Sequence, residues 1–224
     1  MNVKEKYFKR FCLAGKRLPQ DASVVWDDID IYFGKSTDFR DAVLENMEVY
    51  RTGEYRFVLL DIHRQINPVD IRNSLPAGSI LRPLIDSEKM VLLERIFKKR
   101  GQTEDMVLKK KEYVRTLMTL EIKNDPELLR KYIEIHRPEN IWKQVLKNMD
   151  TIGILDMEIY LLGYQAFLIM DTHPDFDLDR EGERWGHLPR EEEWQRFVAK
   201  FQKTDANSQA PEKWKPMKRI VEIP

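Results

Sequence analysis

Apolar and polar residues in the second half of the chain follow two different periods. Residues 113–121 alternate and are rich in β-branched and apolar side chains, which predicts a strand. After an N-cap residue and a proline in the sequence 124–127, apolar residues recur three and four positions apart, which predicts a helix. Pro138 disfavours helical geometry at the residue before it, so we expect a break there and a second helical stretch over 139–149.

The pattern then changes to two short apolar runs, over 154–162 and 164–171, that meet at Gly163. This spacing predicts a tight β-hairpin with a positive φ at the glycine. An acidic loop is expected next, followed by a second helix over 191–202 and a last strand over 213–223. The order strand, helix, strand, strand, helix, strand is the split pattern of ferredoxin-like modules.

The first half of the chain repeats this pattern in a reduced form. Positions 47–63 and 157–173 share a Met, a Glu, a Tyr, a Gly, a Phe, an Asp and a His at matching places. Such an internal repeat defines the folding unit before any single element is assigned. The stretch 39–44 is interpreted as the remainder of the first helix, and 64–88 is too short and too rich in breakers to hold the second. The first copy is therefore expected to lack one helix.

These patterns predict an α+β fold made of two ferredoxin-like (βαββαβ) modules. The first module covers 1–97, the charged segment 98–111 is a linker, and the second module covers 112–224. A module of this kind leaves one face of its sheet exposed, and two modules commonly bury these faces against each other. We therefore expect an intrachain pseudo-dimer, a dimeric α+β barrel within one monomeric chain.

Composition narrows the classes of function. Because 38 Lys and Arg balance 38 Asp and Glu, the chain offers no long-range attraction for nucleic acid or an anionic membrane surface. No apolar run reaches the length of a transmembrane helix, and the N-terminal sequence lacks the apolar core of a signal peptide, so a cytoplasmic location is expected. Cys12, the single cysteine, lies in a predicted strand and is interpreted as a buried structural thiol.

Among the four histidines, His136 occupies the position best suited to chemistry. It follows Tyr132 by four residues, so both side chains leave one face of the predicted helix near its C-terminal end. The helix dipole there favours the protonated form and keeps the group titratable near neutrality, as a general acid or base requires. The alternative is a half-buried structural histidine bonded to a backbone carbonyl.

Other candidate residues have two interpretations each. Trp142 and Trp194 lie on apolar helix faces, where core packing and stacking on a sugar ring are both open. The acidic run 191–193 could supply a general acid, but acidic residues that open a helix are normally solvated and stabilised by the helix dipole. His63 and His173 share one repeat position, which favours a structural capping role. The sequence contains no glycine-rich phosphate loop, nucleophile elbow or histidine-pair metal motif.

With these residues in view, the second copy resembles the L-rhamnose mutarotase family over 111–224. The likeness rests on Tyr132, His136 and Trp142 in series on the first helix, on the hairpin that follows, and on Trp194. The resemblance implies a dimeric α+β barrel that interconverts the α and β anomers of L-rhamnose or a related 6-deoxyhexose. It also implies that no metal or organic cofactor takes part, so the expected partner is a monosaccharide.

The same resemblance assigns the site residues. His136 corresponds to the family's proton donor and Tyr132 to a tyrosine that contacts the sugar. A family tryptophan pair corresponds to Glu193 and Trp194, and Met157 stands where the family has a second sugar-contacting tyrosine. We therefore expect His136 to be catalytic and no residue to bind a metal. The residues expected to contact the sugar are Tyr132, Trp142, Met157, Glu193 and Trp194.

Two other functions stay open at this point. The altered first copy and the changed position 193 favour a non-catalytic sugar-binding or interaction protein descended from a mutarotase. A cofactorless oxygenase on the same barrel would share only the fold. In the first copy, Ala22 and Trp26 stand where the second copy has Tyr132 and His136, so any chemistry is expected in the second copy alone.

Overall fold

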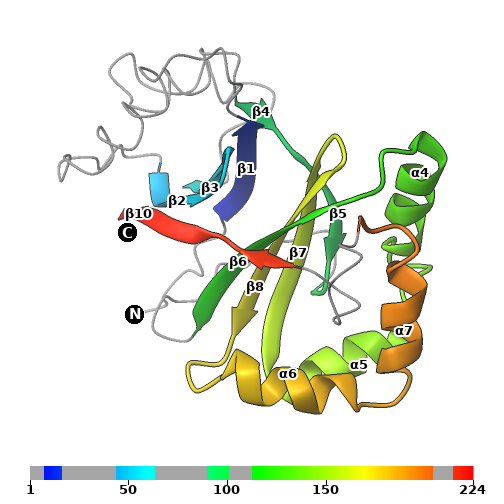
Figure 1. Ribbon diagram of the computed structural model, residues 1–224. Coiled ribbons are helices and arrows are strands. Elements are labelled where there is room, and N and C mark those ends of the chain that lie inside the picture. Colours follow the sequence, from blue (N-terminus) through cyan, green and yellow to red (C-terminus); the bar gives the residue numbers. More distant parts are fainter. Residues whose placement is uncertain (1–7, 17–43, 64–89, 101–112, 204–213, 224) are drawn as a thin grey trace. The chain divides into compact units, whose positions relative to one another are not determined.

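The computed structural model describes residues 8–16, 44–63, 90–100, 113–203 and 214–223 (Figure 1). These residues form two five-stranded antiparallel sheets and belong to two compact units. The first unit contains strands β1 to β4 and β10, and the second contains strands β5 to β9 and helices α4 to α7. The predicted α+β class is therefore confirmed.

The first unit is a sheet in the order β10-β2-β3-β1-β4. Its strands are β1 (Phe8–Lys16), β2 (Leu44–Thr52), β3 (Tyr55–His63), β4 (Val91–Leu92) and β10 (Lys218–Ile223). The predicted hairpin of β2 and β3 is confirmed, with Gly53 at a φ of 47° in its turn, and Cys12 on β1 is buried as expected. The predicted helix remnant over 39–44 lies outside the described residues except for Leu44, which begins β2. The segment 64–88 also lies outside the described residues.

The second unit is a sheet in the order β5-β7-β8-β6-β9, with helices along one side (Figure 1). Its strands are β5 (Glu94–Lys98), β6 (Val114–Glu121), β7 (Ile154–Leu162), β8 (Gln165–Thr172) and β9 (Lys215–Pro216). The hairpin of β7 and β8 is confirmed, and Gly163 in its turn has a φ of 56°. This left-handed conformation explains why glycine stands there.

The final strand of each half is divided between the two sheets. The strand predicted over 213–223 is interrupted at Met217: β9 pairs with β6 in the second sheet, whereas β10 pairs with β2 in the first. The corresponding strand of the first half contributes β4 to the first sheet and β5 to the second. Each sheet therefore contains a strand from the other half of the sequence, which periodicity alone does not predict.

The described helices all belong to the second unit. Asp125 begins the first one as predicted, because its Oδ1 accepts hydrogen bonds from the backbone N–H groups of Glu127 at 2.8 Å and Leu128 at 3.0 Å. The break near Pro138 is confirmed, and Gly153 ends the second helix with a φ of 92°. The helices are α4 (Pro126–Ile135), α5 (Lys143–Ile152), α6 (Leu178–Gly186) and α7 (Glu191–Val198).

Helix α6 occupies the stretch for which the sequence predicts an acidic loop. Asp177 caps it by accepting a backbone N–H of the first turn at 3.0 Å, and Asp179 and Glu181 lie in that turn, where the helix dipole favours negative charge. The loop prediction is wrong because the acidic residues are the ones that start the helix. Only Leu178 and Trp185 are large apolar residues in it, too few to produce a helical period.

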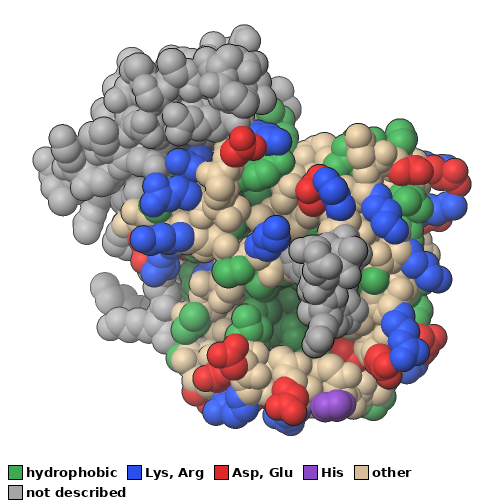
Figure 2. Space-filling model, viewed as in Figure 1, with side chains coloured by type: hydrophobic (Ala, Val, Ile, Leu, Met, Phe, Trp, Pro, Cys, Tyr) green, Lys and Arg blue, Asp and Glu red, His purple; other side chains and the backbone are tan. Residues whose placement is uncertain are grey.

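The apolar core of the second unit lies between the helices and one face of the sheet. Alternate residues of β7, Met157 and Ile159, point into it, and buried Val145 of α5 and Val198 of α7 come from the helices. Burying one large apolar side chain stabilises the fold by roughly 1.5–3 kcal/mol, so this layer holds the helices on the sheet. Figure 2 shows Lys and Arg interspersed with Asp and Glu over α4 and α7, the solvated faces of the amphipathic helices.

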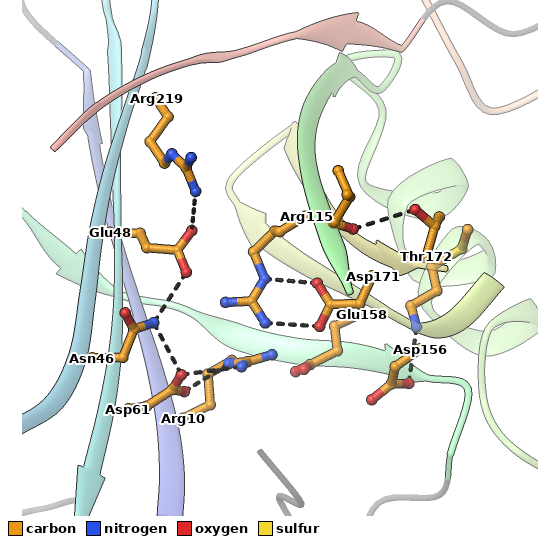
Figure 3. A network of polar contacts seen from close by, with 12 residues as sticks. Arg10, Asn46, Glu48, Asp61, Arg115, Asp156, Glu158, Asp171, Thr172 and Arg219 are labelled. Atoms are coloured by element: carbon orange, nitrogen blue, oxygen red, sulfur yellow. Dashed lines mark hydrogen bonds and ion pairs between the residues drawn. The ribbon is translucent and has the colours of Figure 1, made fainter. Parts of the chain in front are cut away.

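The opposite face of β7 and β8 carries buried polar residues beside the buried apolar residues Phe167 and Ile169. Arg115 contacts Asp171 through two bonds, Nε to Oδ1 and Nη2 to Oδ2, both 2.7 Å long (Figure 3). Tyr160 donates its hydroxyl hydrogen to Glu158 at 2.6 Å. Burial raises the pKa of Asp156, and the charge of the neighbouring Glu158 raises that pKa further.

The hairpin of the first unit carries a similar set of contacts. Arg10 binds Asp61 at 2.8 Å and 3.2 Å, and Asn46 donates to Glu48 at 3.0 Å (Figure 3). The ladder of β2 and β3 shifts register immediately before Asn46, and the ladder of β7 and β8 shifts immediately before Asp156. The two hairpins therefore share their register, their bulge and the type of their buried polar contacts.

Candidate active site

Tyr132 and His136 lie one turn apart on α4 and both point into the core, as the sequence predicts. Their exposed fractions are 1% and 5%, and their ring centroids are 4.4 Å apart. Nδ1 of His136 lies 2.7 Å from the backbone carbonyl oxygen of Tyr132. The contact proposed for a structural histidine is therefore present, but the side chain is fully rather than half buried.

Burial lowers the pKa of His136 to about 4, against the smaller opposing effect of its bond to the Tyr132 carbonyl. The expectation that this group titrates near neutrality is wrong, because its loss of hydration outweighs the helix dipole. The ring is neutral at pH 7. Since Nδ1 faces a hydrogen-bond acceptor, Nδ1 carries the hydrogen and Nε2 carries the lone pair. His136 is therefore equipped to accept a proton.

His136 lines a pocket between the helices and the sheet of the second unit. Its empty volume is about 600 Å³, part of it open to solvent. Its walls are mainly apolar with a few polar groups, as is typical of ligand pockets. Its lining residues are Phe97, Met118, Tyr132, His136, Ile141, Met149, Met157, Ile159, Leu168, Met170, Trp185, Glu191, Trp194, Gln195, Val198, Gln202 and Trp214.

Two further predicted residues, Met157 of β7 and Trp194 of α7, belong to this lining. The Trp194 ring lies 5.9 Å from that of His136. Trp142, at the start of α5, is not among the lining residues; its ring packs on Trp194 at 5.3 Å and lies 4.3 Å from the guanidinium of Arg190. Trp142 therefore supports the aromatic wall from behind.

Glu193 lies outside the lining of this pocket. Its side chain is 58% exposed, and Arg190 donates to its two oxygens at 2.9 Å and 3.1 Å, which lowers the pKa of Glu193. Glu191, only 1% exposed, lines the pocket instead. The interpretation of 191–193 as a solvated run is therefore wrong for Glu191. Its spacing of three residues from Trp194 puts both on one helix face, and this signal could have identified it.

Neutral amide groups hold the Glu191 carboxylate in place. Nδ2 of Asn148 donates to Oε2 at 2.9 Å and to the carbonyl oxygen of Pro189 at 3.0 Å. Nε2 of Gln195 donates to Oε1 at 3.3 Å, and Gln144 donates to Oδ1 of Asn148 at 2.8 Å. Glu191 is also the first residue of α7, where the unpaired N–H groups of the helix favour negative charge.

The described lining contains no Lys or Arg. Nε1 of Trp185, a donor, is buried and has no hydrogen-bond partner among the described residues. Among the described residues, no group of three or more His, Cys, Asp or Glu side chains is placed to hold a metal ion. No helix in the described part of the chain is long and apolar enough to cross a membrane. A neutral imidazole, a carboxylate and an indole N–H in an apolar pocket suit an uncharged polar ligand and transfer of a proton.

Comparison with solved structures yields only distant likenesses. An anthrone oxidase-like protein aligns with 100% of this chain and 95% of its own, with 6% identity and a TM-score of 0.45. A likeness at this level supports no conclusion about activity. In sequence, a UPF0734 protein of Dictyostelium discoideum is 31% identical over 116 residues, which cover 50% of this chain and 91% of that protein.

A mutarotase relative and a family model match as well. The L-fucose mutarotase of Xanthomonas campestris pv. campestris is 29% identical over 109 residues, which cover 49% of this chain and 87% of that protein. Residues 115–223, which include α4 to α7 and every residue that lines the pocket around His136 except Phe97, match the model for L-rhamnose mutarotase. Over residues 115–223, the chain therefore belongs to the L-rhamnose mutarotase family.

Proposed function

We propose that the protein is a sugar mutarotase whose pocket in the second unit interconverts the α and β anomers of L-rhamnose or a related 6-deoxyhexose. The match to the L-rhamnose mutarotase model and to an L-fucose mutarotase supports this isomerase activity. The observation that carries the proposal is His136, a neutral imidazole in the pocket wall whose Nδ1 is bound and whose Nε2 holds the lone pair.

In this mechanism His136 moves one proton. Nε2 accepts the proton of the C1 hydroxyl while the bond between C1 and the ring oxygen breaks and C1 becomes an aldehyde carbon. The imidazolium then gives the proton to the former ring oxygen. After rotation about the bond between C1 and C2, the reverse steps close the ring on the other face. The proton count is unchanged, so the reaction needs no metal or organic cofactor.

The other pocket residues bind the sugar in this proposal. Tyr132 and Trp194 flank His136 and present aromatic surface to the C–H groups of the pyranose, and Met157 forms the floor. Trp142 acts through Trp194, on which it packs. Glu193 takes no part, because its carboxylate is exposed and bound by a neighbouring arginine.

We also propose that the chain is a tandem repeat in which only the second copy works. The first copy (1–97) and the second (112–224), joined by 98–111, would pair as an intrachain dimeric α+β barrel that acts as a monomer in the cytoplasm. The matching register, bulge and polar contacts of the two hairpins support a common origin. Size-exclusion chromatography with light scattering measures the molar mass in solution, and the mass of a single chain is expected.

Saturation-transfer NMR of L-rhamnose and L-fucose tests the activity directly. The wild type is expected to accelerate anomer exchange and His136→Ala to abolish the acceleration. His187→Ala is a matched control, because His187 is also a C-cap residue but is exposed. The wild-type rate should stay constant on acidification and fall only near pH 4, the pKa of His136. Equal exchange by wild type and His136→Ala rejects the assignment.

A non-catalytic sugar-binding protein is the second candidate. It is favoured by Met157, which lacks the hydroxyl of the family's tyrosine, and by the exposure of Glu193 at a family tryptophan position. Calorimetric binding of L-rhamnose without any acceleration of anomer exchange would establish this second function and reject the first.

A further inference from the structure

We propose that Glu191 is a specificity-determining residue of this pocket. Its carboxylate accepts hydrogen bonds from hydroxyl groups of an uncharged sugar and rejects sugars that carry an anionic group. The inference rests on the proposed function of the pocket and concerns a residue for which the sequence pattern predicted a solvated position.

The geometry leaves acceptor sites of Glu191 for a ligand. An ionised carboxyl group offers about four lone-pair directions and donates no hydrogen bond. Asn148 occupies one on Oε2 and Gln195 one on Oε1, at 2.9 Å and 3.3 Å. About two directions therefore stay available on a side chain that lines the pocket and is almost wholly buried. Sugar hydroxyl groups are donors of the kind that fill them.

A purely structural role explains Glu191 less well. Its contact with Asn148 joins α5 to α7, but a glutamine could join the same helices without burying a charge. No ion pair involving Glu191 occurs within the described residues, and burial of a carboxylate held only by neutral amides costs stability unless further donors reach it. A bound sugar supplies these donors, so the cost is offset when the pocket is occupied.

The rest of the pocket agrees with this selectivity. Nε1 of Trp185 is a buried donor without a partner among the described residues, so the pocket offers both an acceptor and a donor to hydroxyl groups, which can act as either. Since the described lining has no Lys or Arg, a phosphate or carboxylate on the sugar would meet the negative charge of Glu191 without compensation.

The test compares two probes, L-rhamnose and its C6 carboxylate counterpart L-mannuronate. Wild type, Glu191→Gln and the control Glu192→Gln are compared, because Glu192 belongs to the same acidic run but is exposed and paired with Arg196. Glu191→Gln is expected to raise the KM for L-rhamnose roughly 5- to 10-fold with little change in kcat, as a charge-assisted hydrogen bond becomes a neutral one. The preference for L-rhamnose over L-mannuronate should fall by at least the same factor, and Glu192→Gln should match the wild type.

An unchanged preference in folded Glu191→Gln overturns the proposal, because a structural role would weaken binding of both probes alike. Thermal unfolding establishes whether the variant folds. If it does not, competition in the wild type decides: L-mannuronate must bind at least about 10-fold more weakly than L-rhamnose, and equal binding overturns the proposal. Absence of any L-rhamnose binding or exchange by the wild type counts against the proposed function instead.

Discussion

Acid should destabilise the fold through His136, by an amount that follows from its burial. The pKa of this group is about 4 in the folded chain and 6.5 for an ordinary histidine. As the pH falls below 6.5, His136 becomes protonated in the unfolded chain but stays neutral in the folded chain. The stability contribution of the neutral histidine is therefore complete above pH 6.5 and is lost progressively between pH 6.5 and pH 4. Each pKa unit corresponds to about 1.4 kcal/mol, so the full loss is about 3 kcal/mol.

Urea unfolding of wild type and His136→Gln, at steps from about pH 7.5 to about pH 4.5, measures this loss. Glutamine does not titrate, and its amide N–H can still reach the Tyr132 carbonyl. The stability advantage of the wild type over the variant should therefore shrink by about 2–3 kcal/mol across this range. Parallel curves for wild type and His136→Gln would refute the reasoning, since they would mean that the folded histidine titrates normally.

Three further predictions concern stability and are read from thermal or urea unfolding. Because burial raises the pKa of Asp156, ionisation of this group costs stability as the pH rises above the ordinary pKa of 3.8. Asp156→Asn should therefore be more stable than the wild type at pH 7 and equally stable near about pH 3. A variant that is less stable than the wild type at pH 7 contradicts this prediction. Gly163→Ala should lower the free energy of unfolding by about 1 kcal/mol, because the φ of Gly163 is 56°. The control Gly182→Ala, inside α6 with free space around it, should raise the free energy of unfolding by about 0.5–1 kcal/mol. Effects of the same sign in both variants would be inconsistent with a backbone origin. Asp125→Ala should cost about 1 kcal/mol, because two N–H groups of α4 lose their cap, and an unchanged melting curve would disprove the role of that cap.

Local signals in the sequence identify most elements of the second unit. Asp125 and the following proline mark the start of α4, and Gly163 marks the turn of the hairpin, because capping and positive φ depend on one or two adjacent residues. The i to i+4 spacing of Tyr132 and His136 places both on one face, and the structure brings them to one pocket. Helix α6 is not predicted from the sequence, because its N-terminal signals are acidic residues and almost no apolar periodicity follows them.

Contacts between segments that are distant in sequence determine how the strands pair and which acidic residues are buried. The pairing of β10 with β2 and of β5 with β7 joins strands far apart in the sequence, and a strand's own alternation does not select its partner. The acidic run at the start of α7 shows the same limit. Glu191 and Glu193 are equally suited to a helix N-terminus, and only the packing of α7 on α5 makes one a pocket residue and the other a surface residue.

By itself, the sequence determined the two hairpins, the start of α4 and which histidine and tyrosine share a helix face, since periodicity, caps and turns are properties of neighbouring residues. The tertiary structure alone decided the protonation of His136 and the burial of Glu191. Both depend on how much water the surrounding helices and sheet exclude, and this exclusion is produced by side chains that are remote in sequence.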